Sequence, residues 1–282
     1  MKKYLTPCAA LLVILLSACD GDDDVVSSSE VATNQIYASM EVHTDGSDIV
    51  YVGVQLTKDQ PPSDTSSDDE YIALSSADDL WFTSGVNMRD VEIEEDLFTA
   101  LADLAKTQEL VEGTTRYHDH GPFFWSLLFP IQTYYDGSLD EVDDGATYTV
   151  SLLREGGIDA KSSTVTMPMP FEIVAPLAGE IFSRSQDSIL IEWLPLEEGV
   201  VIEVEASTAC PDGTLDSYTT TEVTDTGILV LNAGDLISDS LSGSCATELT
   251  VAKSRFGQRA PEFVGGFISA HQLRTVSLTT TD

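Results

Sequence analysis

Two histidines separated by a single residue are the first candidates for chemistry in this chain. In His118-Asp119-His120, positions i and i+2 of a strand point to the same side, so both imidazoles could reach one metal ion. The sequence offers no third ligand, and Gly121-Pro122 follows at once, which favours an exposed turn. The segment is therefore a candidate centre for a metalloprotein or hydrolase, with a polar turn as the alternative.

The known sequence signatures of catalysis are missing from the chain. There is no Gly-x-Ser-x-Gly elbow, no glycine-rich phosphate loop and no His-Glu-x-x-His. The other two histidines, His43 and His271, stand isolated in the sequence. We therefore assign no catalytic residue, no cofactor and no metal ligand, and we expect that the protein is not an enzyme.

Acidic residues gather in three clusters, at 64–70, 90–96 and 136–144. Calcium requires six to eight oxygen ligands from a loop that curls around it. Asp136-Gly137-Ser138-Leu139-Asp140 begins like such a loop, but Glu141 occupies the position where the turning glycine is needed. The clusters therefore favour a solvated acidic surface, and calcium-dependent adhesion stays an alternative.

An aromatic-rich segment lies between Tyr117 and Tyr135 and includes Phe123-Phe124-Trp125 and Phe129. An exposed aromatic platform would bind sugars or an apolar partner. Packed strands would bury the same side chains. Because the run is uniformly apolar and alternates poorly, burial is the favoured interpretation.

Four cysteines occur, and their positions divide them into two pairs. Cys8 and Cys19 lie in the N-terminal segment, whereas Cys210 and Cys245 lie far along the chain. The N-terminal pair belongs to a segment with the features of an export signal, described next. Exported proteins enter an oxidising compartment, so the other two cysteines predict a Cys210–Cys245 disulfide. A metal site would need more ligands at short spacing, and no histidine lies near either residue.

The N-terminal segment has the organisation of a targeting signal. Lys2 and Lys3 precede an uncharged apolar stretch from Tyr4 to Leu16, which is too short for a comfortable membrane span. The tetrad Leu16-Ser17-Ala18-Cys19 resembles the lipobox of bacterial lipoproteins. This resemblance implies cleavage after residue 18 and lipidation of Cys19, so the mature chain is expected to be anchored to the membrane. An ordinary secretory signal that ends at a cysteine is the alternative.

The segment after Cys19 predicts a flexible tether. Asp-Gly-Asp-Asp-Asp and a serine-rich run carry like charges and few apolar side chains, so we expect residues 19–34 to remain unpacked. Asp20 resembles the signal that retains some lipoproteins in the inner membrane. The expected location is the bacterial cell envelope, on the periplasmic side of the inner membrane or on the outer membrane.

From residue 35 onward, apolar side chains alternate with polar ones, which predicts half-buried strands. Every second residue of 36–42, 50–56, 148–152, 189–193 and 200–206 is apolar. Further strands are expected at 71–74, 80–82, 163–167, 218–223, 228–231, 248–251 and 274–279. One segment departs from this pattern, because apolar residues near 94–107 recur at helical spacing and predict a helix.

Two proline residues in Pro168-Met169-Pro170 cannot lie inside a sheet, so we expect a linker at 168–170. The linker divides the chain into a first domain at 35–167, with the helical insertion, and a second at 171–282. The second domain is expected to fold alone and to depend on its disulfide.

Two short motifs resemble those of fibronectin type III and immunoglobulin-like domains. Asp143-Asp144-Gly145-Ala146-Thr147-Tyr148 is similar to a tyrosine corner, and the strand that contains Trp193 is similar to the second strand of a fibronectin type III domain. The resemblance implies an all-β protein of two tandem immunoglobulin-like or fibronectin type III-like β-sandwiches, the first with a short helical insertion.

The charge balance restricts the partners of the chain. The 282 residues contain 13 Lys and Arg against 48 Asp and Glu, a formal net charge of −35. Nucleic-acid affinity comes largely from cationic side chains that release counterions, so DNA and RNA are excluded as partners.

The sequence predicts a membrane-anchored lipoprotein whose β-sandwich domains serve as a binding or structural module, with an envelope protein or glycan as partner. The alternatives are an envelope metalloprotein or hydrolase centred on His118, Asp119 and His120, or a calcium-dependent adhesion module.

Overall fold

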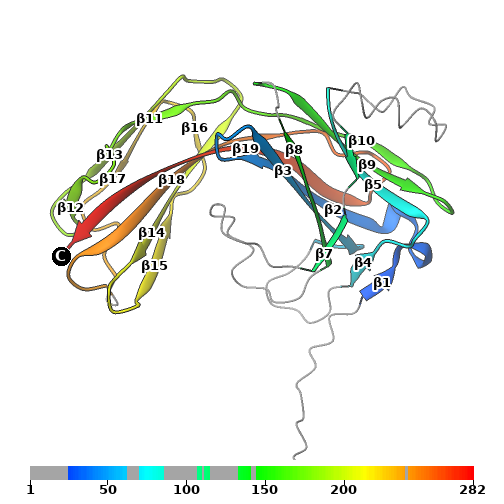
Figure 1. Ribbon diagram of the computed structural model, residues 1–282, viewed down its shortest axis with the longest axis horizontal. Coiled ribbons are helices and arrows are strands. Elements are labelled where there is room, and N and C mark those ends of the chain that lie inside the picture. The colour runs from blue at the N-terminus through cyan, green and yellow to red at the C-terminus, as the bar shows by residue number, and fades with distance from the viewer. Residues whose placement is uncertain are drawn as a thin grey trace, which may run out of the picture.

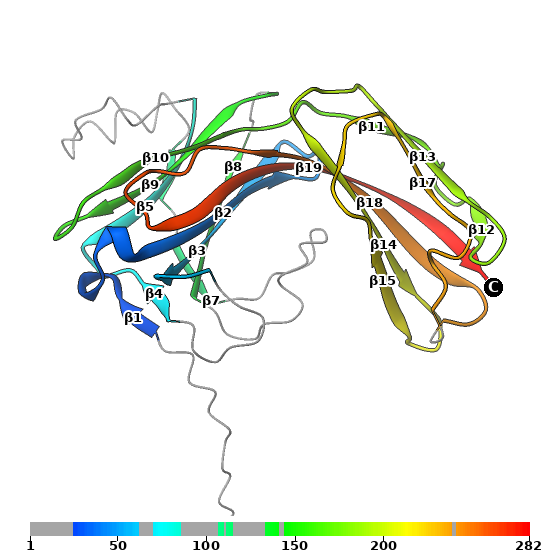
Figure 2. The same ribbon diagram turned by 180° about the vertical axis from the view of Figure 1, so that it is seen from behind.

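The computed structural model describes residues 25–61, 70–85, 107–109, 111–114, 133–140, 144–238 and 241–282. For residues 107–109, 111–114, 133, 134 and 140 it describes the backbone alone. The regular secondary structure of these residues is nearly all β-strand, and two short 3₁₀ helices, Ser28–Glu30 and Thr33–Gln35, are the helical segments among them. Figures 1 and 2 show two lobes, and one long strand, β19, Gly265–Thr281, runs from one lobe into the other.

The first lobe is built from two facing sheets. One sheet has the order β10-β9-β5-β6, and the other contains β7, β8, β4, β3 and β2, followed by the N-terminal part of β19. The bounds of these strands are β2 Ile36–Thr44, β3 Ile49–Lys58, β4 Tyr71–Ala73, β5 Asp78–Ser84, β6 Thr107–Glu109, β7 Val111–Thr114, β8 Thr133–Asp140, β9 Thr147–Arg154 and β10 Ala160–Thr166.

The alternation in the sequence determines which side chains fill the first lobe. The four apolar residues at alternate positions of β2 and the four on β3 are all buried, and so are Tyr148, Val150 and Leu152 of β9. Residues on the opposite parity face away from this core. Period-two alternation therefore identified the inward face of these strands correctly.

The second lobe is also a pair of facing sheets. The smaller sheet has the order β11-β13-β17, and the larger contains β12, the C-terminal part of β19, β18, β14 and β15, with β16 beside β14. The bounds are β11 Glu172–Ala175, β12 Ile181–Ser183, β13 Ile189–Leu194, β14 Val201–Ala209, β15 Leu215–Thr219, β16 Val223–Thr224, β17 Ile228–Leu231 and β18 Cys245–Phe256.

Trp193 is the largest side chain in the core of this lobe and is fully buried. Strand β17 matches the expected bounds, whereas the strand expected at 218–223 is divided. β15 ends at Thr219, which is opposite Glu205 of β14, and β16 begins at Val223, which is opposite Ile202, so the register with β14 shifts by one residue between them. The backbone N–H of Thr220 still donates to the carbonyl of Val204 over 2.9 Å.

Strand β19 belongs to both lobes. Its residues 265–272 pair in parallel with β2 of the first lobe, and its residues 279–281 pair with β12 of the second. Ile268 and Ala270 accordingly lie in the core of the first lobe, whereas Val276 and Leu278 lie in that of the second. The region at 171–282 therefore extends into both cores, and one 12-stranded sheet runs through the molecule.

Two glycines allow the end of β18 and the start of β19 to pack closely against strands of the first lobe. At Gly257 a Cβ atom would lie 2.1 Å from the carbonyl oxygen of Thr164, where the end of β18 meets β10. At Gly266, with φ of +114°, a Cβ atom would lie 1.9 Å from the carbonyl oxygen of Ala38. Only glycine fits at these backbone contacts.

Part of the segment expected to be a tether, from Val25 to residue 34, is packed against the first lobe. β1, Val25–Ser27, pairs with β4, and Ser28, Val31 and Thr33 are buried. The guanidinium of Arg154 holds this segment, because it pairs with Asp78 at 2.9 Å and donates to the carbonyl of Val31 over 2.9 Å. The expectation that residues 19–34 remain unpacked is therefore wrong from Val25 onward. Local composition could not indicate a buried arginine so far along the chain.

Candidate functional site

Several candidates from the sequence lie outside the described residues. These are Cys19, the triplet His118-Asp119-His120, the aromatic run at 123–129, the acidic clusters at 64–69 and 90–96, and the helix expected at 94–106. The last residue of the expected helix, residue 107, is described, and it is the first residue of strand β6. Among the side chains that the structure describes, no group of three or more His, Cys, Asp or Glu could hold a metal ion. None of the helical segments in the described ranges has the length and apolar character that a membrane span needs.

The segment Asp136–Asp140 is a strand and not a loop. It lies in β8, where Gly137 is opposite Val52 of β3. Leu139 faces the core and Asp136 is exposed. An extended strand rises about 3.3 Å per residue, so the backbone positions of residues 136 and 140 lie about 13 Å apart and their carboxylates cannot wrap around one calcium ion.

The two late cysteines meet at the end of the second lobe. Cys210 follows β14 and Cys245 begins β18, and the structure joins them in a disulfide with Cα atoms 4.3 Å apart. Both are buried beside Leu241. Cys245 faces the same side of β18 as Leu249 and Val251, in agreement with the parity of the sequence.

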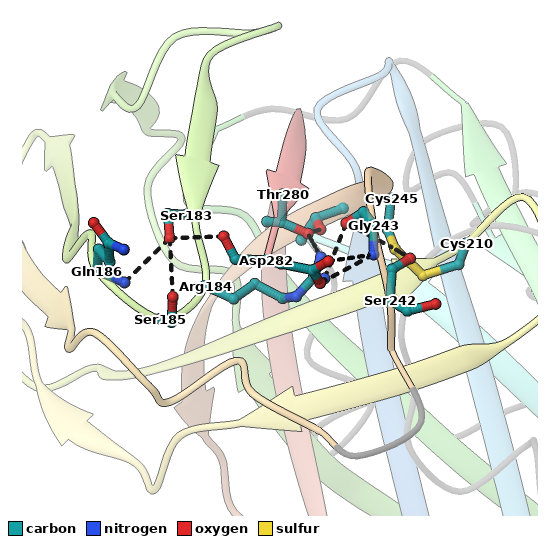
Figure 3. A network of polar contacts seen from close by, with 11 residues as sticks. Ser183, Arg184, Ser185, Gln186, Cys210, Ser242, Gly243, Cys245, Thr280 and Asp282 are labelled. Carbon is teal, nitrogen blue, oxygen red and sulfur yellow. Dashed lines mark hydrogen bonds and ion pairs between the residues drawn. A yellow bond between two sulfur atoms is a disulfide. The ribbon is translucent and has the colours of Figure 1, made fainter.

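Polar contacts surround this disulfide (Figure 3). The buried guanidinium of Arg184 donates to the hydroxyl of Thr280 over 3.1 Å and to the carbonyl of Gly243 over 3.0 Å. It also pairs with the carboxylate of Asp282 at 2.6 Å, and the backbone N–H of Gly243 donates to the same carboxylate. Arg184 therefore connects β19 to the loop that precedes Cys245. This cluster is structural, because its hydrogen-bonding groups bind one another.

The structure brings together His43 and His271, which are far apart in the sequence. They are direct neighbours on the parallel strands β2 and β19, and the ring of His43 stacks on Tyr51 at 5.4 Å. His271 Nδ1 lies 2.7 Å from the hydroxyl of Ser254, and its Nε2 lies 2.8 Å from that of Ser269. Sequence reasoning missed this pair because only tertiary pairing aligns β2 with β19.

Burial controls the chemistry of this histidine pair. Desolvation, with a smaller contribution from His43, lowers the pKa of His271 to about 3. Desolvation also raises the pKa of Glu41, which lies two residues before His43 on the same strand, to about 7. A histidine with so low a pKa is a poor general base near neutral pH. The Ser254–His271–Ser269 chain therefore resembles a nucleophile–base pair in distance but not in basicity.

A buried lysine lies where the two lobes join. Lys253 of β18 is fully buried, and its ammonium donates to the carbonyl of Pro195 over 2.8 Å. It lies 3.5 Å from the carboxylate of Asp225, whose side chain is also fully buried, and 5.1 Å from the centre of the Phe171 ring. Asp225 in turn accepts from the indole N–H of Trp193 over 2.8 Å.

The same cluster holds the linker between the lobes. Glu197 accepts from the backbone N–H of Met169 over 2.8 Å and pairs with Arg255 of β18. The carbonyl of Pro168 accepts from the side chain of Gln272 over 3.1 Å. The linker at 168–170 is therefore bonded to both lobes, which restricts their relative motion.

The outer face of the β11-β13-β17 sheet carries an exposed apolar surface. We define the apolar face as five side chains that are 41–58% exposed, namely Val174, Leu190, Leu194, Ile228 and Val230. Leu190 lies directly opposite Val230, and Glu192 lies opposite Ile228. Both figures show this sheet on the outer side of the second lobe. Apolar surfaces of this kind on a soluble domain are frequently interaction sites.

The apolar face was visible in the sequence only as an irregularity. In the strand that ends at Leu194, the inward positions are Ile189, Ile191 and Trp193, but two of the three outward positions are also leucine. An ordinary half-exposed strand would place polar residues there.

A comparison with protein-family models gives no match, and a comparison with curated proteins gives none either.

Proposed function

We propose that this chain is a lipid-anchored bacterial envelope protein whose two-lobed β body serves as a binding or structural module. The anchor rests on Leu16-Ser17-Ala18-Cys19, which resembles a lipobox. Val25, a few residues after Cys19, already belongs to a strand that pairs with β4, so a tether would have at most the intervening residues. A short tether of this kind would keep the first lobe close to the membrane surface.

The observation that carries the binding role is the apolar face. Five side chains that would normally be buried remain exposed on a sheet whose opposite face packs a complete core. Burial of apolar area is favourable at about 25 cal/mol per Å², so such a face gains free energy when a partner covers it. The bonded linker and the shared strand β19 support a body of fixed shape that presents this face.

For the second lobe we propose an immunoglobulin-like topology. Its β11-β13-β17 sheet follows the order of the first, second and fifth strands of that fold, and β14-β18-β19 follows the order of the third, sixth and seventh. β15 beside β14 corresponds to the additional strand of variable-type domains. Trp193 lies in the core, as the resemblance to a fibronectin type III second strand implied.

Membrane anchoring is tested by replacing the proposed lipidated residue. Cys19→Ala should move the protein from the membrane fraction to the soluble fraction, because two or more acyl chains are needed for durable anchoring. Mass spectrometry of the wild-type N-terminal peptide should show the added acyl mass. Membrane-bound Cys19→Ala protein together with an unacylated wild type would contradict the proposal.

A further inference from the structure

We infer that the apolar face binds an amphipathic α-helix of a partner protein, one whose apolar stripe is flanked by Lys or Arg side chains. This inference rests on the proposed binding function and specifies the chemistry of the partner.

The dimensions of the face fit one helix. Neighbouring strands lie about 4.8 Å apart, so the three strands β11, β13 and β17 span about 10 Å, the diameter of an α-helix with its side chains. Strand β13 has six residues and is about 20 Å long at 3.3 Å per residue. Leu196, which is 54% exposed and lies against Gly227, extends the apolar surface beyond the end of β13.

Two carboxylates lie among the apolar side chains. Glu192 is opposite Ile228 on the outward parity of β13, and Glu172 is opposite Leu194 at the edge strand β11. Both share the outward parity of Val174 and Leu190. A partner that covers the apolar residues must therefore meet carboxylates at two points, and Lys or Arg beside its apolar stripe would pair with both. Glu172 also interacts electrostatically with Arg274, so Glu192 places the stronger requirement on the partner.

The charge of the chain argues against two other occupants. A second copy would bring a formal net charge of −35 against another of −35 and would place Glu172 and Glu192 near the same carboxylates. Unpaired carboxylates in an interface are costly to desolvate. An anionic membrane surface would repel the face for the same reason, since surfaces of this kind attract basic segments.

The test uses residues 19–282 with Cys19→Ala, which retains every described residue and avoids detergent. The probe is a fluorescent helical peptide of about 18 residues with leucine on one face and lysine on the other, long enough to be helical when bound. Binding is followed by fluorescence anisotropy near physiological salt. The double variant Leu190→Thr/Val230→Thr should weaken binding at least about tenfold, a change of about 1.4 kcal/mol.

Matched controls separate this face from general charge attraction. Leu215→Thr removes a leucine that is 75% exposed on β15, in the opposite sheet of the same lobe, and should leave binding unchanged. A peptide with glutamate in place of lysine, and one with serine in place of leucine, should each bind at least about tenfold more weakly.

Four outcomes would overturn the inference. The first two are that Leu190→Thr/Val230→Thr binds the peptide as tightly as the wild type, and that the wild type binds the leucine-free cationic peptide as tightly as the original one. The other two are that the wild type forms a dimer which this variant does not form, and that the wild type binds anionic vesicles which this variant does not bind. The dimer is checked by analytical ultracentrifugation, and the vesicles contain phosphatidylglycerol. None of these results depends on acylation of Cys19, so failure here is distinguishable from failure of the anchor.

Discussion

At the scale of single residues, the buried charges at the lobe junction are the most consequential feature. Lys253 and Asp225 both have fully buried side chains, and their charged groups lie 3.5 Å apart. Removal of one partner from a buried pair leaves an uncompensated charge, which costs about 3–5 kcal/mol. An exposed pair contributes about 0–1 kcal/mol, because solvent screens it and two flexible side chains must be ordered.

We therefore expect Lys253→Met to lower the free energy of unfolding by about 3 kcal/mol, since Asp225 loses its cation while the apolar stem is kept. The matched control is Lys161→Met, which removes the partially exposed pair between Lys161 and Asp159. This control should lose less than about 1 kcal/mol. Urea denaturation of the lipid-free chain measures both. Equal losses in the two variants would show that the Lys253 pair stabilises no more than a surface contact.

At the scale of elements, the second lobe depends on the connection between β14 and β18. Nine residue pairs align these strands from Val201–Ser254 to Ala209–Ala246, and the disulfide lies directly beyond the last pair. Arg184 and Thr280 attach the end of β19 to the same region. The disulfide and the hydrogen bonds therefore secure one end of the larger sheet.

The variant Cys210→Ser/Cys245→Ser should lower the free energy of unfolding by up to about 4 kcal/mol, the chain-entropy value for closing a loop of this length. Urea denaturation compares this variant with its parent chain, which consists of residues 19–282 with Cys19→Ala. Intact mass before and after reduction should show the gain of two hydrogens in the parent chain alone. Two free thiols in the unreduced parent would contradict the disulfide.

At the scale of the whole molecule, β19 makes the two lobes interdependent. Residues 171–282 contain the complete second core, but Phe263 and Ile268 from this region lie in the first core. Separation at the linker would therefore expose apolar side chains and deprive residues 265–272 of their pairing with β2.

We expect residues 171–282 expressed alone to keep the second core and to lose order at its junction end. Amide hydrogen exchange should remain slow at 245–251 and 274–278, which pair with each other. Exchange at 265–268, which pair with β2 and not with β18, should become fast relative to the full chain, because the first lobe is absent. Protection at 265–268 equal to that in the full chain would show that this part of β19 does not need the first lobe.

The period-two alternation of apolar residues was enough to predict which side chains face the cores. Alternation placed Ile36 and its alternate partners, Tyr148, and Trp193 on inward faces, because one face of a half-buried strand must be apolar whatever its neighbours are. It also located β17 and the cysteine parity on β18. These are local properties, and a period of two residues records them directly.

The pairing of strands that are distant in the sequence, and the exposure of particular apolar residues, became known only from the three-dimensional fold. Parallel pairing of β2 with β19 joins segments at opposite ends of the chain and brings His43 beside His271. Arg154 reaches Val31, and Lys253 reaches Asp225, across similarly long separations. The sequence marked Leu190 and Leu194 as apolar but could not show that both remain exposed, with none of the described sheets over them. Period and composition act over a few residues, whereas pairing and burial depend on the global arrangement of the sheets.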